Sequence, residues 1–157
     1  MKSLNRDIVN FFERQGFVIV STINPYGNIH CSAKGIADID ENGLVYIIDL
    51  YVGRTFNNLK NNPTISITAI DEHLFIGYTL IGKAKIVEGE KINSNIIMNW
   101  EERLIKRISK RVIRNIKDDR KNNRHPESRF PTPKYLIEME VEDIVDLTPR
   151  DLFKSFS

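Results

Sequence analysis

An arginine and a threonine, Arg54 and Thr55, follow Gly53 directly after an apolar run and ahead of an asparagine-rich stretch. An arginine side chain carries a fixed positive charge and can donate two hydrogen bonds to one phosphate group. The threonine adds a hydroxyl group, and the glycine lets the backbone approach a ligand closely. If a helix begins here, its free N–H groups and partial positive charge favour the same anion. These residues therefore predict a phosphate-binding site, with a solvated arginine on a capped surface helix as the alternative.

A short helix within residues 52–63 is expected to position this group. Thr55 is its predicted N-cap, because threonine is favoured at that position. Phe56 and Leu59 lie three residues apart and can anchor one face of the helix on a core. Pro63 ends the helix, since proline has no N–H group with which to continue the hydrogen-bond ladder.

Runs of β-branched and alternating apolar residues predict the elements around this helix. Six strands are expected, at residues 17–23, 29–39, 44–49, 64–70, 74–88 and 135–147. Gly77 and Gly82 are expected to bend the fifth strand or to form bulges in it. Short turns between neighbouring strands indicate hairpins and therefore antiparallel pairing. Further helices are expected at 3–15 and about 90–121. We therefore predict a mostly β fold with flanking helices, built on a closed or nearly closed six-stranded antiparallel barrel. A single domain is expected to span residues 1–157.

Charge is distributed unevenly along the chain, although the net charge is only +2, from 23 basic and 21 acidic residues. Residues 103–124 contain ten Lys or Arg and two Asp, which leaves 13 basic and 19 acidic residues elsewhere. The helical segment expected at about 90–124 is therefore basic. It could meet nucleic acid, an anionic membrane or a partner, or guide an anionic ligand to the barrel. The favoured interpretation is a packed helix with a solvated outer face.

The composition argues against several classes of protein. No apolar run reaches the roughly 18–20 residues that a membrane-spanning helix needs. The N-terminal residues mix charged with apolar side chains, unlike a signal peptide, so we expect a cytoplasmic protein with no membrane partner. Cys31 is the only cysteine, which excludes an intramolecular disulfide, and the three histidines are too far apart in sequence to suggest metal ligands. No metal site is predicted.

Four stretches and the last strand follow one another in a characteristic order and spacing. They are VSTINPYGNIHCSAKG (20–35), NGLVYIID (42–49), GRTFNNLKNNPTISI (53–67), LIGKAKIVE (80–88) and YLIEMEVEDIVDLTP (135–149). In these stretches the chain resembles the pyridoxamine 5′-phosphate oxidase-like family of FMN-binding split barrels. The resemblance covers roughly residues 5–88 and 134–149, and it does not cover the helix expected at 90–121.

The resemblance implies an antiparallel split barrel of the FMN-binding type, with the flavin in a groove between the subunits of a homodimer. It implies that Arg54 and Thr55 hold the flavin phosphate. It also implies that the second strand and the end of the third contact the isoalloxazine ring, through Ser32, Ala33, Lys34, Ile48 and Asp49. This assignment is physically coherent, because a phosphate dianion needs fixed cations and a flat, largely apolar ring with polar edges suits the end of a strand.

The implied function is that of an FMN-dependent oxidoreductase acting on a small molecule, with a nicotinamide as one candidate electron donor. FAD or a deazaflavin coenzyme is the alternative cofactor, and no side chain is predicted to act as a catalytic acid or base. The chain departs from the oxidases proper at Thr55, where they carry a second basic residue, and near Gly77, where they carry a glutamine. Its C-terminal LTPRDLFKSFS also differs from their basic, substrate-binding tail. Oxidation of pyridoxamine 5′-phosphate itself is therefore not the expected activity.

Two rival functions remain open at this point. The protein could bind a flavin without turnover, as a carrier or a sensor. Alternatively, an empty barrel could serve as an interaction module that binds nucleic acid or a partner through the basic residues 103–124. Of these partners, nucleic acid is the less favoured.

Overall fold

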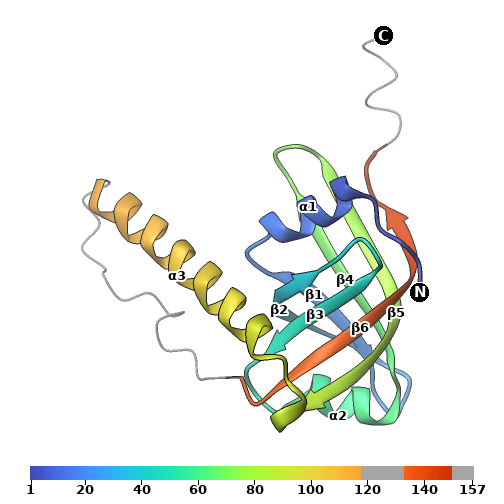
Figure 1. Cartoon of the computed structure of the whole chain (residues 1–157). Coiled ribbons are helices and arrows are strands. Elements are labelled where there is room, and N and C mark those ends of the chain that lie inside the picture. The colour runs from blue at the N-terminus through green and yellow to red at the C-terminus, as the bar shows by residue number, and fades with distance from the viewer. Residues whose placement is uncertain (118–132, 150–157) are drawn as a thin grey trace.

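Six strands form one sheet that closes into a barrel in the computed structural model, which describes residues 1–117 and 133–149 (Figure 1). The strands are β1 (Val18–Ile23), β2 (Ile29–Ile39), β3 (Leu44–Asp49), β4 (Thr64–Asp71), β5 (Ile76–Glu88) and β6 (Tyr135–Asp146). Their order around the barrel is β1-β2-β3-β6-β5-β4, and β4 pairs with β1 to close it. Every neighbouring pair is antiparallel. The predicted six-stranded antiparallel barrel is confirmed.

Three α-helices flank the barrel within the described residues: α1 (Arg6–Arg14), α2 (Arg54–Asn61) and α3 (Ser94–Lys117). A short 3-10 helix, η1 (Gly89–Lys91), connects β5 to α3. The helix α2 lies at one end of the barrel, whereas α3 runs beside it and extends away from it toward its C-terminal end (Figure 1). Three predicted features lie outside the described part of the chain. They are the end of the long helix near residue 121, most of the basic side chains in residues 103–124, and the tail 150–157.

The main core fills the inside of the barrel. Its most deeply buried side chains include Val20, Ile47, Ile67, Leu80, Ile137 and Met139. Because side chains alternate across a strand, these residues point inward while their neighbours face outward. Burying an aliphatic side chain of this size contributes about 1.5–3 kcal/mol, so the apolar interior is the principal source of the barrel's stability.

A second, smaller cluster joins α3 to the outside of the barrel. Its buried members are Ala37, Ile48, Ile96, Trp100, Leu104 and Leu136. Charged contacts support this packing, since Arg103 lies 3.7 Å from Glu13 of α1 and 3.8 Å from Asp38 of β2. The N-terminal half of α3 is thereby held against β2, β3 and β6, where it forms one wall of a cleft.

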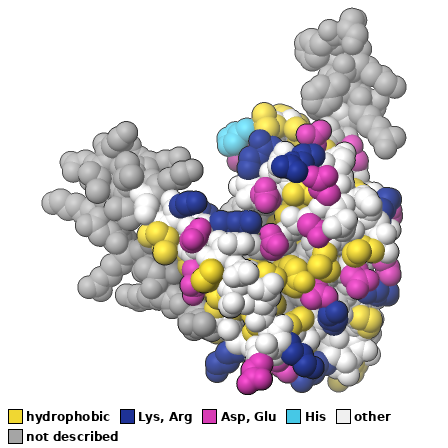
Figure 2. Space-filling model, viewed as in Figure 1, with side chains coloured by type: hydrophobic (Ala, Val, Ile, Leu, Met, Phe, Trp, Pro, Cys, Tyr) yellow, Lys and Arg dark blue, Asp and Glu magenta, His cyan; other side chains and the backbone are white. Residues whose placement is uncertain are grey.

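Charged side chains of both signs are interspersed over the face of the barrel seen in Figure 2. Within residues 1–117 and 133–149, none of the helices combines the length and the hydropathy that crossing a membrane would require.

Candidate functional site

A cleft of about 360 Å³ lies between α3, the middle of β2 and the end of β3. Ala33 and Lys34 of β2 and Ile48 and Asp49 of β3 line it. Other parts of the wall come from α3 and from the segment after α1, with Gly16, Phe17, Trp100 and Arg107. The volume falls within the range of about 300–1,000 Å³ that is typical of small-molecule sites. Four of the residues predicted to contact a cofactor ring therefore meet in one cleft.

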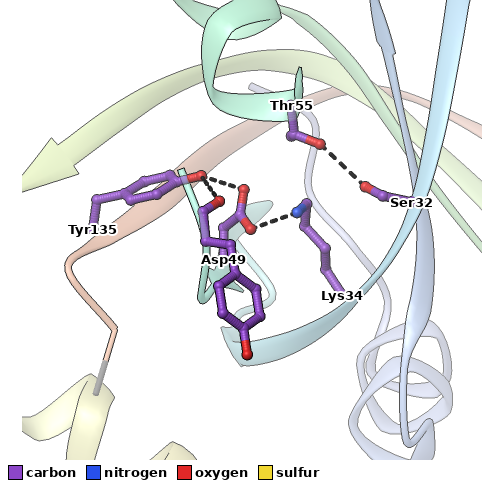
Figure 3. Close-up of polar contacts among 6 residues, drawn as sticks. Ser32, Lys34, Asp49, Thr55 and Tyr135 are labelled. Atoms are coloured by element: carbon purple, nitrogen blue, oxygen red, sulfur yellow. Dashed lines mark hydrogen bonds and ion pairs between the residues drawn. The ribbon is translucent and has the colours of Figure 1, made fainter. Parts of the chain in front are cut away.

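Lys34 and Asp49 form an ion pair in the wall of this cleft (Figure 3). The Lys34 Nζ atom lies 2.6 Å from Asp49 Oδ1, and the two side chains are only 9% and 5% exposed. A charge removed from water needs a close partner of opposite sign, and each of these groups supplies that partner to the other. The positive charge of Lys34 is consequently held at a defined position.

Tyr135, the first residue of β6, completes this polar group on the side of Asp49 away from Lys34 (Figure 3) and does not line the cleft. Its hydroxyl group donates a hydrogen bond to Asp49 Oδ2, and it also lies 3.4 Å from the backbone oxygen of Tyr51. Burial, and then the hydrogen bond and charge of Asp49, raise the pKa of Tyr135. The phenol therefore remains protonated and continues to donate to the carboxylate.

The predicted phosphate-binding residues lie at the start of α2. Arg54 is exposed and, among the described residues, has no hydrogen-bond or ion-pair partner, so its guanidinium group is available to a ligand. Thr55 is buried, and its Oγ1 atom is hydrogen-bonded to Ser32 Oγ at 3.1 Å (Figure 3). The N-cap is Gly53, without a side-chain cap. The prediction that Thr55 caps the helix is therefore wrong, because its hydroxyl group is directed to β2 instead.

Two further contacts seat α2 on the barrel. The buried Asn58 side chain donates a hydrogen bond from Nδ2 to Thr22 Oγ1 of β1, at 3.0 Å. The Phe56 ring meets the Tyr135 ring edge to face, with centroids 4.8 Å apart. These contacts hold α2 against the end of β1 and the start of β6, and the Thr55–Ser32 contact places its N-terminus beside β2.

The strand β2 connects the predicted phosphate-binding residues at the start of α2 with the predicted ring-binding residues in the cleft. Because Ser32 and Lys34 are two residues apart on one strand, their side chains point to the same face. Ser32 contacts Thr55 at the start of α2, and Lys34 contacts Asp49 in the cleft. The start of α2 and the cleft are therefore adjacent, although Ser32, Arg54 and Thr55 do not line the cleft itself.

Sequence reasoning missed three residues of this site: Trp100, Arg107 and Tyr135. Trp100 is buried and lines the cleft. Arg107 donates a hydrogen bond from Nη1 to the Gly16 backbone oxygen, while its Nε atom is buried without a partner among the described residues. The signal for Tyr135 was weak, because a tyrosine in a buried strand needs a hydrogen-bond partner but does not indicate which one.

The donor set suits an organic cofactor with an anionic group. The cleft offers apolar surface from Ala33 and Ile48 beside the fixed ammonium group of Lys34. Arg54 and the free N–H groups of the first turn of α2 suit a phosphate. Within the described residues, no three His, Cys, Asp or Glu side chains gather as they would around a metal ion.

Comparison with family models shows which family the chain belongs to. Residues 4–146 match the model described as pyridoxamine 5′-phosphate oxidase. The chain belongs to this family. The match includes the motifs between residues 20 and 88, most of the last motif in β6, and the α3 segment between them. Membership of the family was therefore correctly predicted from the sequence.

Several solved structures share the fold of this family member. HupZ of Group A Streptococcus is 16% identical, with a TM-score of 0.63 and coverage of 92% of this chain and 94% of that one. An F420 reductase is 14% identical, with a TM-score of 0.57 and coverage of 87% and 94%. HutZ, the heme storage protein from Vibrio cholerae, is 19% identical, with a TM-score of 0.52 and coverage of 92% and 94%. No curated protein matches the chain. At these identities the likeness concerns the fold alone.

Proposed function

We propose that the protein binds FMN in the cleft and uses it to oxidise or reduce a small molecule. The observation that carries this proposal is the meeting of Ala33, Lys34, Ile48 and Asp49 in one cleft beside the N-terminus of α2. Membership of the pyridoxamine 5′-phosphate oxidase family supports it. FAD or a deazaflavin in place of FMN is the alternative.

Each predicted residue has a role in this proposal. Arg54 and the first-turn N–H groups of α2 hold the phosphate, and the Ser32–Thr55 hydroxyl pair shapes the adjoining surface. Ala33 and Ile48 supply apolar contact to a ring, and the Lys34–Asp49 pair faces its polar edge. When bound, the flavin supplies the hydride or electron transfer, while the protein supplies orientation and electrostatics.

We place a second copy of the chain against the outside of β1 and β4. A groove of about 480 Å³ lies there and includes Phe17, Ile19 and Ile70 among its walls. Phe17 and Ile70 are each 63% exposed, and with Ile19 they line one groove, so they form a contiguous apolar patch of the kind that a partner can cover. Phe17 also lines the cleft, so a partner in the groove would border the flavin site. This supports the homodimer that the family resemblance implies.

The first test is the absorbance spectrum of the protein as purified, with any released small molecule identified by mass. A flavin spectrum and the mass of FMN support the proposal, whereas a Soret band from heme or a protein that takes up no flavin contradicts it. Bleaching of the bound flavin by NADH or NADPH, followed by reoxidation, then separates an enzyme from a carrier or sensor.

The phosphate contact is tested by Arg54→Glu. Loss of a charged hydrogen bond costs about 1.5–3 kcal/mol, so we expect FMN affinity, measured by quenching of flavin fluorescence, to fall by about tenfold or more. The matched control is Lys60→Glu, which reverses a charge in the last turn of the same helix, away from the proposed phosphate. Equal affinities of the two variants would contradict the proposed role of Arg54.

A further inference from the structure

The carboxylate of Asp49 is held by two different strands at once. Asp49 and Tyr135 are direct partners in the β3–β6 ladder, and Gly35 pairs with Ile48 in the β2–β3 ladder, which brings Lys34 next to Asp49. Each carboxylate oxygen has its own partner, Oδ1 the Lys34 ammonium group and Oδ2 the Tyr135 hydroxyl group. The strand register therefore builds this contact into the barrel.

Only part of this group reaches the cleft. Lys34 and Asp49 line it, whereas Tyr135 is 1% exposed and lies behind it. The Phe56 ring packs edge to face on the Tyr135 ring, at 73° between the ring planes, and limits the movement of the phenol. A buried and immobilised hydroxyl group can thus orient a carboxylate whose other oxygen fixes a cation.

We propose that Tyr135 is a positioning residue: it fixes Asp49, Asp49 fixes the Lys34 ammonium group, and this group of three sets how strongly the cleft stabilises negative charge on a bound ring. This inference rests on the proposed flavin binding. Reduction of a flavin by two electrons and one proton leaves one negative charge on the ring. The position of Lys34 and the partial neutralisation of Asp49 by Tyr135 should therefore favour the reduced form.

The first experiment examines the three side chains without reference to flavin chemistry. The full-length protein is acetylated with acetic anhydride, and the rates at individual lysines are followed by mass spectrometry. Lys34 should react more slowly than the exposed Lys60 in the wild type, and several times faster in Tyr135→Phe. Equal rates for Lys34 and Lys60 in the wild type, or an unchanged Lys34 rate in the variant, would overturn the proposal.

The second experiment measures the midpoint potential of bound FMN, with dithionite as the reductant and a reference dye. Tyr135→Phe should make the potential more negative, because Asp49 loses the hydroxyl group that neutralises part of its charge. Asp49→Asn should make it more positive, because the negative charge itself is removed. Shifts in opposite directions cannot come from a general loosening of the fold.

Tyr46→Phe is the matched control, since it removes a hydroxyl group from another tyrosine of the barrel, in β3. Burial, and then the nearby Glu138 carboxylate, raise the pKa of Tyr46, so this phenol also lies beside an acid, but Glu138, unlike Asp49, does not line the cleft. Its potential should equal that of the wild type. If Tyr135→Phe does not fold, the Asp49→Asn variant decides the matter, through the sign of the shift in its midpoint potential and the rate at which its Lys34 is acetylated.

Failure of this inference can be told apart from failure of the proposed function. A wild type that binds no FMN overturns the proposed function and the flavin part of the inference together. Bound FMN whose potential is the same in the wild type, Tyr135→Phe and Asp49→Asn overturns the inference alone.

Discussion

Single hydroxyl and carboxyl groups form the polar contacts in and behind the wall of this cleft. Tyr135 is almost completely buried, and its ordinary phenol pKa of 10.0 is raised first by that burial and then by the hydrogen bond and charge of Asp49. Because the folded protein holds the phenolic proton more tightly than the unfolded chain does, Tyr135 links stability to pH. Its stabilising effect is fully present below pH 10 and is lost as the pH rises above that value.

We therefore expect alkaline unfolding to depend on Tyr135. The free energy of unfolding, measured by urea titration between about pH 8 and 11, should fall less steeply with pH in Tyr135→Phe than in the wild type. The control is Tyr26→Phe, in which the mutated tyrosine is 89% exposed. If the wild type and Tyr135→Phe lose stability in parallel, the phenol is not held as the structure describes.

At the scale of elements, close contact between strands controls the shape of the barrel. The β5–β6 ladder shifts register between Ile81 and Gly82, where Glu142 of β6 is skipped, so the bulge lies opposite Gly82 and its extra residue is in β6, not in β5 as predicted. No corresponding irregularity occurs at Gly77 in the β4–β5 ladder, where Gly77 pairs regularly with Ile70. A Cβ atom at position 82 would lie 1.9 Å from the backbone oxygen of Glu140. The bulge therefore depends on the absence of a side chain.

Gly82→Ala should consequently destabilise the barrel. The added methyl group would force β5 and β6 apart, and such overpacking typically costs about 1–3 kcal/mol. Urea unfolding of the variant provides the measurement. Gly53→Ala is the comparison, because its Cβ atom would meet only the Tyr51 backbone oxygen, at 3.9 Å. A loss in Gly82→Ala no greater than that in Gly53→Ala would argue against tight packing at the bulge.

At the scale of the whole molecule, the cleft and the proposed subunit interface share a border. Phe17 lies between them, with the cleft on one side and the apolar groove of β1 and β4 on the other. In our proposal a second copy covers the exposed Phe17 and Ile70 side chains and encloses the flavin more fully. Assembly and cofactor binding would then support each other.

This arrangement predicts the effect of Ile70→Glu on the oligomeric state. The wild type should have the mass of a dimer in analytical ultracentrifugation, and Ile70→Glu that of a monomer, because a carboxylate buried in an apolar interface loses its hydration. Tyr26→Glu, which places the same charge in an exposed turn, should remain dimeric. A monomeric wild type, or an Ile70→Glu variant that is still dimeric, would contradict the proposed interface.

The elements and the family could be predicted from the sequence because their signals are local. Alternation of apolar residues, turn residues such as Pro25 and Gly27, and the apolar spacing of Phe56 and Leu59 each act within a few residues of the chain. The six strands follow from these signals, and short turns account for the antiparallel pairing of β1 with β2, β2 with β3 and β4 with β5. The order of the motifs then identified the family.

Only the tertiary structure decided which side chains meet. Tyr135 and Asp49 are 86 residues apart in sequence, and their contact depends on the β3–β6 register. Likewise, Thr55 has the right residue type for a cap, but the seating of α2 on β1 and β2 directs its hydroxyl group to Ser32. The cleft also needs the packing of Trp100 in α3, a segment outside the resemblance. Local patterns determine strands and turns, whereas closure of the barrel determines which strand ends become neighbours.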